Sequence, residues 1–133
     1  MTADLLRESR ALLDQPPSAA PGLWERAAVL LARQALEGAL DRFWASRSPD
    51  LLQASMRAQL LCLGTLMNNE RDAADVDQLW GALSDACHFD ACAPAPSAAE
   101  IHVWLEETAR LCRILERRTG RRSFGADPSP AVR

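Results

Sequence analysis

The sequence predicts an all-α fold, an up-and-down bundle of four long helices plus a short N-terminal helix. Apolar residues recur at spacings of three and four along most of the chain, which is the period of an amphipathic helix. No run alternates β-branched and polar residues over the length of a strand, so no sheet is expected. The connections between the periodic segments are short, which favours antiparallel neighbours.

The short N-terminal helix is expected over residues 3–14, and the central helix of the bundle over residues 23–45. Three prolines between residues 16 and 21 separate them, because proline cannot continue a helix. The second helix is apolar around most of its circumference, so it should touch several neighbours. Its polar side chains form one stripe, at Arg26, Arg33, Glu37 and Asp41.

Three further helices follow. The third is expected over residues 50–67, where an asparagine pair ends it. The fourth, residues 71–89, begins among acidic side chains that complement the positive end of the helix dipole. The fifth opens at Ser97 and Glu100, whose spacing is that of a capping box.

The chain of 133 residues is most simply one domain, residues 1–122, with a C-terminal tail at 123–133. The tail contains two prolines and few apolar residues, so disorder is expected there. No apolar run approaches the roughly 18 residues of a membrane span. The first ten residues include acidic side chains and lack the apolar core of a signal peptide, so a cytoplasmic location is expected.

The charge and the residue types exclude several classes of function. The net charge is −3 and the pI about 5.3, which does not suit a broad DNA-binding surface. All fifteen basic residues are arginine, and lysine and tyrosine are absent, so no Schiff-base or P-loop lysine is available. A lysine-free, alanine-rich composition is typical of GC-rich bacteria. Four arginines between residues 117 and 122 could contact RNA phosphates, or simply complement the end of the fifth helix.

The segment SDACHFDAC, residues 84–92, holds the densest group of reactive side chains. As a metal site it would use Cys87, His88 and Cys92, with His102 from the next helix. The spacing matches no standard zinc pattern, and adjacent residues on a helix point about 100° apart. The favoured interpretation therefore has Cys87 packing as a small apolar group and His88 meeting the helix C-terminus, with no cofactor bound.

The same segment is a poor candidate for covalent catalysis. Cys92 or Ser84 would need His88 as a base, a group to orient that base and a stabiliser for the developing oxyanion. The sequence supplies no nucleophile elbow of the GxSxG type.

The chain has four tryptophans, each in a different part of the predicted bundle: Trp24, Trp44, Trp80 and Trp104. The first interpretation is that they pack in the core. The second places them, with His88, at the rim of a protein interface, because tryptophan is enriched among the residues that dominate binding energy.

Residues 27–44, AAVLLARQALEGALDRFW, combine small residues, a Gln-Ala-x-Glu core and an aromatic close. This helix resembles the leading helix of HEPN domains, which are small α-helical bundles of bacterial toxin, defence and RNA-processing systems. The resemblance implies metal-independent RNA cleavage by a dimer, using an arginine followed after four to six residues by a histidine. Upstream of His88 and of His102, the corresponding positions contain no arginine. The resemblance therefore implies a non-catalytic relative.

Three functional hypotheses follow. In the first, a HEPN-like bundle binds a protein partner or RNA, as a homodimer and without catalysis. In the second, a divergent ribonuclease uses His88 or His102 with an arginine from another helix, such as Arg57 or Arg113. In the third, the cysteines and histidines around residue 88 form a small metal- or thiol-dependent regulator.

Overall fold

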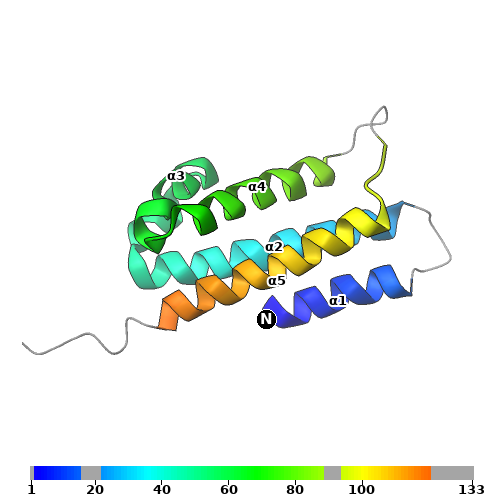
Figure 1. The fold of residues 1–133 in the computed structure, drawn as a ribbon, viewed down its shortest axis with the longest axis horizontal. Coiled ribbons are helices and arrows are strands. Elements are labelled where there is room, and N and C mark those ends of the chain that lie inside the picture. Colours follow the sequence, from blue (N-terminus) through cyan, green and yellow to red (C-terminus); the bar gives the residue numbers. More distant parts are fainter. Residues whose placement is uncertain (1, 16–21, 89–93, 121–133) are drawn as a thin grey trace, which may run out of the picture.

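The computed structural model describes residues 2–15, 22–88 and 94–120, and within these ranges it contains helices and no strand (Figure 1). The elements in chain order are α1 (Thr2–Asp14), α2 (Leu23–Arg47), the 3₁₀ helix η1 (Pro49–Gln53), α3 (Met56–Met67), α4 (Glu70–Cys87) and α5 (Ala98–Gly120). The predicted all-α class is confirmed. The tail predicted at 123–133 lies outside the described residues.

Helix α2 is the centre of the bundle, as its apolar circumference predicts. It packs against α1, α4, α5 and η1. Figure 1 shows α1, α2, α4 and α5 running along the long axis of the molecule, with α3 at one end. Between residues 28 and 44, α2 buries nine side chains, among them Phe43 and Trp44, which meet edge to face with ring centroids 5.1 Å apart. None of the described helices is both long and apolar enough to cross a membrane.

The prediction of a single helix over residues 50–67 is wrong in its first turn, because the chain forms two elements there, η1 and α3. Ala54 is extended, with φ −80° and ψ 158°, and separates η1 from α3. The Ser55 hydroxyl accepts a hydrogen bond from the backbone N–H of Ala58 at 3.2 Å, so α3 begins at its own N-cap. The buried amide of Gln59 donates to the carbonyl oxygens of Leu51 and Ala54, at 2.9 and 3.2 Å, which fixes η1 against α3.

The asparagine pair after α3 both ends that helix and begins the next. Asn68 adopts the left-handed conformation at φ 52°, which asparagine tolerates better than most residues. The Asn69 side chain accepts from the backbone N–H of Asp72 at 3.1 Å and caps α4. The predicted capping box of α5 is confirmed, since Ser97 and Glu100 exchange backbone-to-side-chain hydrogen bonds of 3.0 and 3.1 Å.

Candidate functional site

Trp80 on α4 lies under a guanidinium group from α2. The Cζ of Arg33 is 4.6 Å from the centroid of the Trp80 ring, which is cation–π geometry. Arg33 is held in turn by Glu37, one turn along α2, with Nε and Oε1 3.1 Å apart. The polar stripe predicted on α2 thus contributes two members to a contact between α2 and α4.

Helix α3 extends this contact into a shallow depression of about 400 Å³, lined by Arg57, Leu60, Leu61, Asp77 and Trp80. These five residues together with Arg33 are called the Trp80 face. Leu60 packs against the core, whereas Leu61 is 77% exposed, because adjacent side chains on a helix point about 100° apart. The face therefore presents a half-buried indole, an exposed leucine and charges of both signs.

The other three tryptophans are buried to different degrees. Trp44 is completely buried, so it cannot lie at the rim of an interface as the second interpretation placed it. Its indole Nε1 has no hydrogen-bond acceptor among the described residues. Trp24 and Trp104 are half-buried and pack against the edge of the core.

The described residues around His88 form the end of a helix. Helix α4 ends at Cys87, and the backbone N–H of His88 donates to the carbonyl oxygen of Asp85 at 3.2 Å. The His88 side chain is exposed, while Cys87 packs at the edge of the core. Cys92 lies outside the described residues. Within the parts of the chain that the structure describes, no three His, Cys, Asp or Glu side chains are placed to hold a metal ion.

The residues named for a ribonuclease lie on different parts of the surface. Arg57 belongs to the Trp80 face, whereas His102 and Arg113 line a depression of about 490 Å³ on α5. Eleven residues separate His102 from Arg113, which is roughly 16 Å along a helix. Both side chains border this depression from positions about three turns apart.

The basic run at the end of α5 is partly structural. Arg118 donates a hydrogen bond to the carbonyl oxygen of Met67, the last residue of α3, and its Nη2 lies 3.7 Å from a carboxylate oxygen of Asp72. Arg117 is exposed. Arg121 and Arg122 lie outside the described residues. One of the arginines proposed to contact phosphate is therefore engaged in joining α5 to α3 and α4.

No family model matches this chain. Searches of curated proteins and of solved structures give no match either. The resemblance of residues 27–44 to HEPN domains stays a prediction from the sequence. The candidate site is chosen on geometry alone. The Trp80 face is where one predicted binding residue, Trp80, meets the exposed Leu61 and charged side chains.

Of the six residues of the Trp80 face, the sequence predicts only Trp80 as a binding residue. Arg33 reads as part of a solvated stripe on α2, and Leu61 falls between apolar positions of α3. The exposure of Leu61 could have been predicted from the sequence. Leu61 lies outside the spacing of Leu60, Leu63 and Met67, so a leucine there faces away from the core.

Proposed function

We propose that this protein acts by binding, without catalysis, and that its Trp80 face joins two copies of the chain into a homodimer. The observation that carries the proposal is the exposure of Leu61, 77%, directly beside Trp80 and Arg57 in one depression. Tryptophan and arginine are the residue types most enriched among those that dominate binding energy. A large exposed leucine in the same depression adds apolar area that association removes from water.

The charges of the Trp80 face favour a second copy as the partner. Arg57 and Asp77 lie in the same depression with opposite signs. In a two-fold interface each surface meets itself, so Arg57 of one copy can face Asp77 of the other. A surface of one sign would repel its own copy, whereas this one is complementary to itself.

The wider role is proposed on the resemblance to HEPN domains. The helix that carries the resemblance is α2, the central helix of the bundle. We infer a non-catalytic bacterial relative with a regulatory or defence role, in which the dimer presents further surface to a protein or RNA partner.

The test is the molar mass in solution, measured by light scattering after size exclusion and by sedimentation velocity. The native chain is expected to be a dimer, and Leu61→Glu is expected to be a monomer, because the substitution buries two unpaired carboxylates at the interface. Val103→Glu is the matched control. Val103 is 67% exposed on α5, outside the Trp80 face, and its substitution should leave the dimer intact.

A monomeric native chain at tens of micromolar would overturn the proposal, as would dissociation by Val103→Glu but not by Leu61→Glu. Circular dichroism of both variants separates loss of association from loss of folding. The divergent ribonuclease has one observation in its favour, the shared depression of His102 and Arg113. RNA cleavage abolished by His102→Ala would replace the binding proposal with that one.

A further inference from the structure

Helix α1 packs against α2 and α5, and half of the side chains that it buries are polar. Leu6 and Leu13 are the apolar ones, whereas Thr2 and Ser9 carry hydroxyl groups. By contrast, all four side chains that α4 buries are apolar. A mixed contact of this kind is typical of parts that dock reversibly, because permanent interfaces are more apolar.

Both hydroxyl groups of α1 are bonded to α2. The Ser9 hydroxyl donates a hydrogen bond to the carbonyl oxygen of Ala28 at 2.7 Å. The Thr2 hydroxyl accepts a hydrogen bond from the guanidinium of Arg42. Water can replace either partner when the helices separate, so the net contribution of such a bond to stability is small. The two bonds therefore position α1 on α2 without fixing it there permanently.

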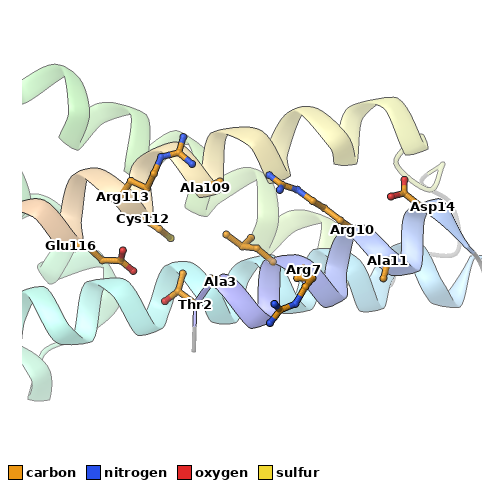
Figure 2. Close-up of a pocket in the computed structure, with 11 residues that line it drawn as sticks. Thr2, Ala3, Arg7, Arg10, Ala11, Asp14, Ala109, Cys112, Arg113 and Glu116 are labelled. Atoms are coloured by element: carbon orange, nitrogen blue, oxygen red, sulfur yellow. The ribbon is translucent and has the colours of Figure 1, made fainter.

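The contact between α1 and α5 is incomplete. A groove of about 620 Å³ lies between them (Figure 2), and its lining includes the small side chains of Ala3, Ala11 and Ala109. Cys112 of α5 belongs to the same lining and is only 2% exposed. Helix α1 therefore helps to cover the Cys112 thiol without packing tightly against the helix that carries it.

The ion pairs beside the groove are open to solvent. Nη2 of Arg10 on α1 lies 3.1 Å from Oε1 of Glu106 on α5. Arg42, which bonds the Thr2 hydroxyl, lies 3.5 Å from Glu116 of α5. Each of these four charged side chains is at least 42% exposed. Exposed pairs contribute little to stability and are screened by salt, so these contacts weaken as the ionic strength rises.

The other helices are joined to each other by contacts that do not involve α1. Helix α2 packs directly against α4 and α5. Arg47 of α2 donates to the carbonyl oxygen of Arg118 on α5 at 2.6 Å, and Arg110 of α5 donates to Asp75 of α4 at 2.9 Å. Opening of α1 leaves these contacts in place, so it requires less free energy than unfolding of the whole bundle.

We propose that α1 is a reversibly docked arm, which opens from α2 and α5 while the other helices stay folded and thereby exposes the Cys112 thiol. Ionic strength sets the fraction of open molecules, through the pairs of Arg10 and Arg42. The arm includes no residue of the Trp80 face, so the inference does not rest on the proposed homodimer.

The experiment is alkylation of the native chain with N-ethylmaleimide at pH 8, in which mass spectrometry of the digested protein gives the labelling rate of Cys112. Hydrogen exchange of the α1 amides is measured under the same conditions. Labelling is expected to be at least about tenfold faster than global unfolding, measured by urea denaturation, allows. The α1 amides should report the same opening equilibrium as Cys112, and 1 M NaCl should speed the labelling.

Three variants separate opening of the arm from global unfolding. Ser9→Ala should speed the labelling of Cys112 about fivefold, and Arg10→Gln about twofold, because each removes a contact of α1. Arg110→Ala is the matched control. It weakens the contact between α4 and α5 and leaves α1 untouched, so Cys112 should be labelled at the native rate.

Two results would overturn the proposal. If Arg110→Ala speeds the labelling as much as Ser9→Ala does, the thiol is reached only by global unfolding. If the α1 amides exchange as slowly as the most protected amides of α2, the arm does not open by itself. Circular dichroism of each variant verifies that the bundle is folded during the measurement.

Discussion

Arg110 on α5 donates a hydrogen bond to Asp75 on α4, with Nη2 and Oδ2 2.9 Å apart. The same guanidinium binds Glu107 on its own helix, at 2.6 and 3.0 Å, and lies 3.9 Å from Asp72. One arginine thus joins three carboxylates across the seam between α4 and α5. Hydrogen bonding with Glu107, followed by that with Asp75, holds the pKa of Arg110 above its ordinary value against partial desolvation.

The first prediction is that Arg110→Ala lowers the free energy of unfolding by roughly 1 kcal/mol, since the side chain is 40% exposed and solvent screens its pairs. The raised pKa means that the guanidinium contributes fully at every pH below its ordinary value, so the loss should not change across the neutral range. Urea denaturation at low salt and at 1 M NaCl provides the measurement, and high salt should shrink the effect. Arg117→Ala, at an exposed position on the same helix, should cost much less.

The second prediction concerns stability at alkaline pH. Desolvation is the largest cause of the raised pKa of Cys112, which moves from 9.0 to about 12. The neutral thiol is therefore favoured in the folded chain, and this stabilisation is complete below pH 9 and is lost as the pH rises toward 12. The free energy of unfolding should fall over that window by an amount on the order of a few kcal/mol.

Cys112→Ala should make the free energy of unfolding less dependent on pH between 9 and 12, however much the substitution destabilises the chain at neutral pH. The comparison is simple in this chain because it has neither lysine nor tyrosine to titrate in the same window. An identical slope in the native chain and in Cys112→Ala would show that the thiol is not the group responsible.

The third prediction compares two substitutions at Trp44. Trp44→Ala empties a completely buried site and should cost about 3–5 kcal/mol. Trp44→Phe keeps much of the ring and removes an N–H that has no acceptor among the described residues, so it should cost only about 1–2 kcal/mol. Chemical denaturation of both variants measures the two losses of stability. Equal losses would mean that the indole N–H has a bonding partner in solution.

Local pattern accounts for much of the fold. The apolar circumference of residues 23–45 predicts a central helix, and α2 has that place. The spacing of Ser97 and Glu100 predicts a cap, and both hydrogen bonds form. These predictions hold because the interactions that decide them lie within a few residues of each other.

The sequence does not predict contacts that depend on how helices are placed side by side. The break at Ala54 is secured by Gln59, whose amide bonds carbonyl oxygens five and eight residues earlier, and propensity alone does not show this. The stacking of Arg33 on Trp80 joins residues 47 positions apart. The groove between α1 and α5 arises from small residues on two helices at opposite ends of the chain, which no local window contains.

Because the four tryptophans are unequally buried, their fluorescence should report on different parts of the protein. Trp44 is shielded from solvent, so its fluorescence should resist quenching by iodide until the whole bundle unfolds. Trp80 is only half-buried and has a guanidinium against its ring, so its emission should respond to anything that covers the depression around it. A chain in which the other tryptophans are replaced by phenylalanine would therefore report on surface events from position 80 and on global unfolding from position 44.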